Sequence, residues 1–401
     1  MQGQNIIMVC QQNWDLDIDS NAKNLAKEFA RHNTVMYVNM PLDTNGLLLG
    51  RSRPDVKKKM RVVLGQAEGL VQVEPKLWVC TPGVLCLSAN WINSKAPFRR
   101  INRFNSLLLA RSIGKAAKQM GFDGYYLFQD GIIFQALELP RLLRPRKFIY
   151  YLRDFTLTVP YFRQHGPWVE AEVMRRADVV VTNSVYLNDY ARQHNQQNSH
   201  YIGQGCVLSL YQASARYAQP TELTNLSGPL IGYTGLLTGL RLHIDLLLSI
   251  ARQRPNWNVV LIGPEDVDFQ NSSLHELPNV FFLGRKPPEE LPAYLSCFNV
   301  CINPQAINEV TVGNYPLKID EYLAMGKPVV ATRTRTMELF QDHVYLAEGE
   351  AEWMAQLEHA LHDHDPKLAE ARIGFAQSHT WKASADLLYA AIETAENEVV
   401  T

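Results

Sequence analysis

Short apolar runs recur along this chain, and many lead directly into a glycine or a small polar residue. Residues 258–262, for example, run into Gly263. Between such runs lie stretches with apolar residues at helical spacing, the first over residues 22–29 behind Ser20, a favourable N-cap. This alternation predicts an α/β protein with doubly wound parallel sheets, in which ligands bind at the carboxyl ends of the strands. The expected strands are 6–10, 34–39, 125–128, 147–152, 177–182, 200–203, 230–233, 258–262, 280–283, 300–304 and 329–332, with a hairpin over 70–73 and 77–80.

The length of 401 residues suits two domains of ordinary size. The alternation pauses over 206–227, where Gln, Ser, Thr, Asn and Pro show no clear periodicity. We therefore expect a first Rossmann-like domain over 1–205, a linker over 206–227 and a second Rossmann-like domain over 228–375. A last helical segment over 376–401 completes the chain.

Several classes of protein are disfavoured by what the chain lacks. No segment reaches the roughly 18 uninterrupted apolar residues that a membrane span needs, and the N-terminal residues lack a signal-peptide pattern. The 6 cysteines include no CxxC pair and no ligand-like grouping with histidine, so we expect reduced cysteines, no metal and a cytoplasmic protein. No GxGxxG fingerprint follows the first strand, which argues against a nicotinamide dinucleotide.

The stretch 308–332 is the most informative part of the chain. A polar loop leads into a short helix, in which Pro316 is expected in the first turn and Gly326 at the end. Lys318 and Glu321 are three residues apart and share one face of that helix. A loop that enters a helix at the end of a sheet can bind an anion, so a phosphate group could meet Lys318, while Glu321 suits sugar hydroxyls.

Charge is distributed unevenly between the two halves. Residues 1–210 contain 26 Lys and Arg against 16 Asp and Glu, and the remainder contains 13 against 24. Two basic segments, 51–61 and 91–104, carry much of the excess, and the second also contains aromatic residues. We expect them to dock on the anionic inner face of a membrane; the alternative is an ordinary solvated charged loop. No RNA-binding module is visible, so nucleic acid is not expected. The residues assigned to this surface are Lys57, Lys58, Lys59, Trp91, Arg99, Arg100 and Arg103.

The second half of the chain resembles the GT-B glycosyltransferases, most of all the glycosyltransferase family 4 group and its relatives in bacterial polysaccharide synthesis, such as the teichuronic-acid and xanthan-type glycosyltransferases. The resemblance rests on residues 232–235, Arg241, 254–264, 279–285, 291–294 and 316–330, in this order. It implies two Rossmann-like domains that face each other across a cleft. The first would hold the acceptor, the second would hold a nucleotide-sugar, and the last helix would pack back on the first domain.

The resemblance also implies roles for individual residues. Glu321 matches the second of two family glutamates and is expected on the ribose hydroxyls, whereas Gly313 stands at the position of the first. Lys318 matches a lysine near the diphosphate. The expected donor-binding residues are Gly235, Arg241, Gly263, Arg285, Thr311, Asn314, Lys318 and Glu321, with a UDP- or GDP-linked sugar as substrate and no cofactor.

Transfer without a metal requires cations and loop amides to stabilise the departing diphosphate, a role that we assign to Lys318 together with Arg241. An inverting enzyme also needs a base for the acceptor hydroxyl. Asp154 and Asp130, at the ends of two expected strands, are the candidates, although either could be a helix N-cap and a retaining enzyme needs neither.

The expected function is therefore metal-independent transfer of a sugar to a lipid-linked or glycan acceptor. Two alternatives remain. One is a nucleotide-binding scaffold that has lost the chemistry, for which Gly313 is the main argument, and the other is a nucleotide-sugar epimerase of the same fold. A phosphorylase would need a pyridoxal lysine, for which the sequence offers no support.

Overall fold

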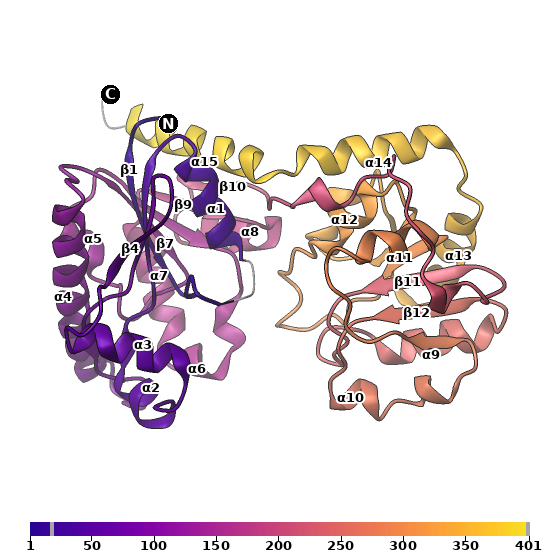
Figure 1. The fold of residues 1–401 in the computed structure, drawn as a ribbon, viewed down its shortest axis with the longest axis horizontal. Coiled ribbons are helices and arrows are strands. Elements are labelled where there is room, and N and C mark those ends of the chain that lie inside the picture. Colours follow the sequence, from indigo (N-terminus) through magenta and orange to yellow (C-terminus); the bar gives the residue numbers. More distant parts are fainter. Residues whose placement is uncertain (17–19, 398–401) are drawn as a thin grey trace. The chain divides into compact units, whose positions relative to one another are not determined.

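A computed structural model describes residues 1–16 and 20–397, and the chain divides into two compact units. The first unit contains Met1–Gly203 and the C-terminal segment that begins at Trp381, and the second contains Gln204–Thr380 (Figure 1). Residues 206–227, where we expected a linker, belong to the second unit, and Tyr211 and Leu223 lie in its core.

The described strands of the first unit form a sheet in the order β10-β9-β8-β7-β1-β2-β5-β4. Neighbouring strands pair in parallel except for β4, which forms the expected antiparallel hairpin with β5. The order reverses between β1 and β7, so their carboxyl ends flank a topological switch point. The strands are β1 (Asn5–Cys10), β2 (Thr34–Val38), β4 (Leu70–Glu74), β5 (Leu77–Cys80), β7 (Tyr126–Asp130), β8 (Phe148–Leu152), β9 (Val179–Thr182) and β10 (Ser199–Tyr201), and β3 (Leu42–Asp43) pairs separately with β6 (Leu85–Cys86).

Helices cover both faces of this sheet. Ser20 caps α1 (Asn21–Ala30) by accepting a hydrogen bond from the Lys23 N–H, and the apolar side of α1 shares a core with α15 (Trp381–Asn397). The long α4 (Lys95–Gln119) and α7 (Gly166–Arg176) pack against the other face. The last helix of the chain therefore belongs to the first unit (Figure 1), whereas residues 376–380 of the segment expected there belong to the second unit. The remaining helices are α2 (Thr44–Leu49), α3 (Pro54–Val63), α5 (Leu139–Leu143), α6 (Pro160–Arg163) and α8 (Val185–Arg192).

The described strands of the second unit form a parallel sheet in the order β13-β12-β11-β14-β15-β16. Counted from β11 this is the 3-2-1-4-5-6 order of a dinucleotide-type Rossmann fold, with the switch point between β11 and β14. The strands are β11 (Leu230–Thr234), β12 (Asn258–Ile262), β13 (Val280–Phe282), β14 (Val300–Asn303), β15 (Val329–Thr332) and β16 (Tyr345–Ala347).

The helices of the second unit divide between the two faces of its sheet. Helices α9 (Ile244–Gln253) and α13 (Gly349–Leu361) contribute to one core, and α11 (Leu291–Cys297), α12 (Lys318–Ala324) and α14 (Pro366–Ser378) contribute to the other. The short α10 (Val267–Gln270) follows β12.

The helix that carries Lys318 begins two residues later than predicted. Leu317 is its N-cap, so Pro316 precedes the helix and its carbonyl accepts a hydrogen bond from the Ile319 N–H at 3.0 Å. Gly326 follows the helix with a positive φ of 69°, which confirms the predicted end. Over the described residues, no helix is both long and apolar enough to cross a membrane.

Candidate functional site

Two glycine loops meet at the carboxyl end of the second sheet. Gly235 follows β11 with φ 138°, and its N–H donates to the Ile262 carbonyl at 2.8 Å. Gly263 follows β12 with φ 152°, and a Cβ placed there would lie 1.8 Å from the Gly235 oxygen. A side chain at Gly263 would therefore separate the two loops, and glycine allows their backbones to touch.

The Lys318 side chain lies over this junction. Its Nζ is 4.8 Å from the centre of the Tyr233 ring, near the end of β11, which is a favourable position for a cation. A Cβ at Gly235 would lie 3.0 Å from Lys318 Cε and 3.3 Å from Nζ. The absence of a side chain at Gly235 thus leaves room for the ammonium group at the switch point between β11 and β14.

Glu321 lies one turn further along α12 than Lys318. Burial raises the pKa of its carboxyl group, and Asp320 adds to that effect, whereas the Lys318 ammonium and a hydrogen bond from the Tyr211 hydroxyl lower the pKa. Tyr211 comes from the segment 206–227. The structure therefore brings a cation and a half-buried carboxylate together at one end of α12, as the spacing predicted.

The loops that follow β11 and β14 are tied together by their backbones. The Ala306 N–H donates to the Arg241 carbonyl at 2.9 Å, and the His243 N–H donates to the Pro304 carbonyl at the same distance. The side-chain amide of Asn308 also donates to the Leu240 carbonyl at 2.8 Å. Arg241 is consequently held at the carboxyl edge of the sheet with an exposed side chain.

Other expected residues occupy different settings. Thr311 is fully buried, and its hydroxyl donates to the Ala306 carbonyl and accepts from the Asn308 N–H, so its hydrogen bonds are made within the loop. Asn314 is half-buried, and its N–H donates to the Thr311 carbonyl. Arg285 is exposed beyond β13, at the edge of the sheet away from β14.

The two candidate bases of the first unit lie on either side of one arginine. Arg153 Nε is 2.7 Å from Asp130 Oδ1, and Arg153 Nη1 is 2.8 Å from Asp154 Oδ2. Asp130 is fully buried at the end of β7, whereas the Asp154 side chain is 57% exposed. Asp154 is thus the carboxylate of this pair that is open to an incoming molecule.

The chain is similar to known glycosyltransferases at three levels. Residues 228–363 match the family model described as glycosyl transferases group 1. The second unit carries a glycosyl transferases group 1 domain. This domain contains Gly235, Arg241, Lys318 and Glu321.

A protein of Bacillus subtilis (strain 168), named as a teichuronic acid biosynthesis glycosyltransferase, TuaH, is 29% identical over 226 residues. The match spans 53% of this chain and 56% of that relative's length.

Solved structures share the fold across both units. HepE of Anabaena, in complex with UDP, has a TM-score of 0.66 at 15% identity and covers 98% of this chain and 100% of its own. The trehalose-phosphate synthase of Burkholderia vietnamiensis has a TM-score of 0.68 at 12% identity and covers 100% and 99%. The sucrose-phosphate synthase of Thermosynechococcus elongatus has a TM-score of 0.63 at 16% identity and covers 98% and 100%. The α/β architecture with two parallel-sheet domains is therefore that of the GT-B glycosyltransferases, as predicted.

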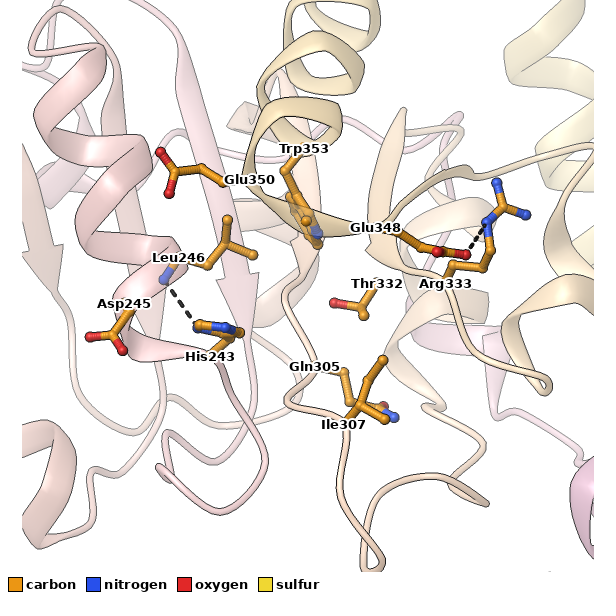
Figure 2. Close-up of a pocket in the computed structure, with 11 residues that line it drawn as sticks. His243, Asp245, Leu246, Gln305, Ile307, Thr332, Arg333, Glu348, Glu350 and Trp353 are labelled. Carbon is orange, nitrogen blue, oxygen red and sulfur yellow. Dashed lines mark hydrogen bonds and ion pairs between the residues drawn. The ribbon is translucent and has the colours of Figure 1, made fainter.

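A pocket of about 650 Å³ lies at the carboxyl edge of the second sheet, towards the face that α9 and α13 cover. Figure 2 shows its lining, in which His243 and Leu246 come from the start of α9, and Glu348 and Trp353 from the start of α13. These helices cover the sheet face opposite α12. Carboxylates outnumber guanidinium groups in the lining, which contains Asp245, Glu348 and Glu350 but one arginine, Arg333, and that arginine is paired with Glu348. A diphosphate fits this pocket poorly, and the loops around Lys318 suit it better.

The predicted basic surface is only partly exposed. Lys57, Arg100 and Arg103 are exposed, as is Lys58, which pairs with Asp15 at 2.8 Å. Lys59 is 8% exposed, and burial lowers its pKa. Its side chain is therefore not part of the exposed basic surface. Arg99 is paired with Glu172 at 2.5 Å.

Exposed apolar side chains lie on neighbouring segments of the same unit. Leu48 and Leu49 of α2 are 76% and 88% exposed, and Trp91 is 74% exposed. The Ser88 hydroxyl accepts from the Asn45 N–H at 3.0 Å and the Ser88 carbonyl accepts from Trp91 Nε1 at 2.9 Å, which joins α2 to the segment around Trp91.

Sequence reasoning did not single out Asp320 of α12, nor the residues around that helix, which are Tyr211, Tyr233, Tyr315 and His379. The sequence contains one signal that could have identified Asp320. This residue lies on the apolar stripe of the helix, with Leu323 and Ala324 three and four positions later. A charged residue at such a position needs a buried partner. Among the described residues, no group of His, Cys, Asp and Glu forms a metal site.

Proposed function

We propose that the protein is a glycosyltransferase that transfers a sugar from a nucleotide-diphosphate donor to a hydroxyl group of an acceptor, without a metal ion. The observation that carries this proposal is the position of the Lys318 ammonium over Tyr233, beside the side-chain-free Gly235 and one turn from Glu321. The group 1 domain match and the name of the Bacillus subtilis relative support the same activity.

Each group of this site has a task in the transfer. As the bond between the sugar and the diphosphate breaks, negative charge grows on the leaving group, and Lys318 with Arg241 stabilises it. The Glu321 carboxylate accepts hydrogen bonds from the ribose hydroxyls, which orients the nucleotide. The complexes of HepE with UDP and with UDP-glucose make UDP-linked sugars the first donors to test, before GDP-linked sugars.

The acceptor hydroxyl loses a proton when it attacks the sugar. In an inverting reaction Asp154 accepts that proton, because both carboxylates pair with Arg153 but only the Asp154 side chain is exposed. The acceptor is lipid-linked, and the protein reaches it from the cytoplasmic face of the membrane. The exposed Leu48, Leu49 and Trp91 near basic residues support this location.

Two measurements test the donor assignment. The melting temperature of the wild-type protein should rise with UDP or a UDP-sugar, because a ligand that binds the folded state stabilises it. Lys318→Ala should weaken UDP binding roughly 10- to 100-fold, the equivalent of about 1.5–3 kcal/mol for a hydrogen bond to a charged group. Lys118→Ala, on an exposed part of α4, serves as the control and should bind like the wild type.

One observation favours a second function, that of a nucleotide-binding scaffold. Gly313, which is buried, stands where the resemblance places the first family glutamate. Release of UDP from UDP-sugars in the presence of a bacterial lipid extract separates the two functions. UDP binding without sugar transfer, across a panel of UDP- and GDP-sugars, would favour the scaffold.

A further inference from the structure

A buried carboxylate next to Glu321 connects three segments of the second unit. Asp320 has no exposed surface, and its Oδ1 lies 2.7 Å from His379 Nδ1. Its Oδ2 accepts a hydrogen bond from the Tyr315 hydroxyl at 2.8 Å. When Asp320 is ionised it only accepts hydrogen bonds, and the proton of the first contact is then on the imidazole Nδ1. Both oxygens of Asp320 are therefore satisfied by side chains from outside α12.

The two partners come from different places in the chain. Tyr315 lies in the loop before α12, directly after Asn314 and three residues before Lys318. His379 follows the last residue of α14, two positions before the chain enters the first unit at Trp381. Aromatic rings hold both partners, because Tyr315 contacts Phe340 with 5.4 Å between ring centres and His379 contacts Phe375 with 4.5 Å between ring centres.

The start of α12 needs such support from outside the helix. Its N-cap is Leu317, which offers no side-chain hydrogen bond, so the helix does not fix the preceding loop by capping. The loop carries Asn314, and the first helical residue is Lys318. Any rotation of the backbone at Tyr315 would move both of them relative to Gly235. A hydrogen bond at Tyr315 fixes the loop between these two positions.

We propose that Tyr315, Asp320 and His379 form a clamp that fixes the donor-binding loop 308–317 against α12 and α14, with all three acting as positioning residues. The effect of the clamp on donor binding rests on the proposed function, because Lys318 and the loop amides bind the diphosphate only when they are held in place. Adjacent carboxylates on α12 then have separate tasks: Glu321 faces the ligand, and Asp320 holds the loop that completes the site.

The burial of Asp320 gives the clamp its strength. A fully buried carboxylate is unfavourable unless both oxygens are hydrogen-bonded, so the protein favours the arrangement in which Tyr315 and His379 are both in place. Loss of either partner leaves an unsatisfied oxygen in the core. The loop then gains access to conformations in which Lys318 is no longer fixed, and donor affinity falls because the ordering must be restored on binding.

Three variants and one control test the clamp. His379→Ala removes the imidazole donor, and His379→Asn keeps an N–H near the position of Nδ1. Tyr315→Phe removes only a hydroxyl group. It tests the same clamp if His379→Ala fails to fold. His362→Ala, at the exposed end of α13, makes the same chemical change away from the clamp.

The first readout is amide hydrogen exchange over residues 309–319 in the absence of any nucleotide. His379→Ala and Tyr315→Phe should speed exchange in this loop, and His379→Asn and His362→Ala should exchange like the wild type. Wild-type exchange in both His379→Ala and Tyr315→Phe would overturn the clamp, as would a failure of His379→Asn to restore protection although it folds.

The second readout separates positioning from general damage. His379→Ala should raise the Kd for UDP and the KM for the donor about tenfold, with kcat changed less than twofold and with recovery in His379→Asn. A tenfold fall in kcat without a change in KM would overturn the positioning role. If the wild-type protein binds no nucleotide, the proposed function fails, and the exchange experiment alone then decides whether the clamp exists.

Discussion

Arg153 Nε lies 2.7 Å from Asp130 Oδ1, and this contact neutralises a carboxylate that has no exposed surface. Burial raises the pKa of Asp130 and the Arg153 guanidinium lowers it. The other oxygen, Oδ2, has no hydrogen-bond partner within the part of the chain that the structure describes. The pair lies at the switch point of the first sheet, where the structure brings both acidic candidates of that unit together.

Removal of the arginine should therefore be costly. Arg153→Met leaves Asp130 buried without a partner, and we expect a loss of about 3–5 kcal/mol in the free energy of unfolding, measured by urea denaturation. Asp130→Asn in the same background removes the unpaired charge and should recover part of that loss. A loss below about 1 kcal/mol in Arg153→Met would contradict the buried ion pair.

The contact between the two glycine loops predicts a difference between two alanine substitutions. Gly263→Ala introduces a methyl group against the Gly235 carbonyl, in a backbone region that disfavours side chains, and should destabilise the protein by about 3 kcal/mol or more. Gly284 has a positive φ of 64°, in the left-handed helical region, and a Cβ there would meet nothing within 4 Å, so Gly284→Ala should cost only about 1–2 kcal/mol. Thermal unfolding of the two variants side by side gives the comparison, and equal losses would refute the close contact.

A buried glutamate in the first unit should make stability depend on pH. Glu170 has no exposed surface; burial raises its pKa to about 7, although hydrogen bonds from Tyr150 and Tyr190 lower it. A raised pKa in the folded state gives stability that is fully present below the unfolded value of about 4.5 and is lost as the pH rises through about 7. Between pH 4.5 and 8 the loss should approach about 3 kcal/mol.

Glu170→Gln cannot ionise and should remove this pH dependence, which urea denaturation at a series of pH values would detect. Glu290→Gln, at an exposed position, should retain the wild-type profile. An unchanged profile in Glu170→Gln would show that the carboxyl titrates normally in the folded protein.

The exposed leucines of α2 predict a specific defect in membrane binding. Replacement of Leu48 and Leu49 by serine should weaken sedimentation with liposomes that contain anionic lipid by roughly tenfold, because about 1.5 kcal/mol or more of apolar burial is lost. Leu387→Ser on α15, where the leucine is 50% exposed, provides the matched control.

The basic residues should act through charge on the same surface. Lys57→Gln with Lys58→Gln should weaken liposome binding at low salt and have little effect at high salt, because salt screens exposed charges. Binding to neutral liposomes as strong as binding to anionic ones would count against the basic surface.

Much of the fold was predictable because the signals are local. The expected strand over 258–262 coincides with β12, and α15 lies within the expected last helical segment over 376–401. The three-residue β16 and the helix α14 were not predicted, since a strand of that length has almost no periodicity and α14 has few apolar residues on a single stripe. The expected linker was wrong in one respect, because Tyr211 anchors part of it in the core of the second unit.

In the candidate site, too, features that depend on local spacing were predictable, and those that depend on distant contacts were not. Lys318 and Glu321 were found because helical spacing places them on one face, whatever surrounds the helix. Lys59 and Lys58 could not be distinguished, although one is buried and the other exposed, because three consecutive lysines give no indication of which one points inward. The partners of Asp320 lie 5 and 59 residues away along the chain.

The sequence by itself determined the alternation of strands and helices, the glycines at the strand ends and the pair of charges on α12, because each depends on neighbours a few residues apart. Only the tertiary structure decided that a side chain at Gly263 would meet Gly235, that Arg153 neutralises Asp130 and that His379 reaches Asp320. These relationships depend on how parallel strands are ordered and how distant helices pack, and burial in that packing sets the cost of leaving a polar group unpaired.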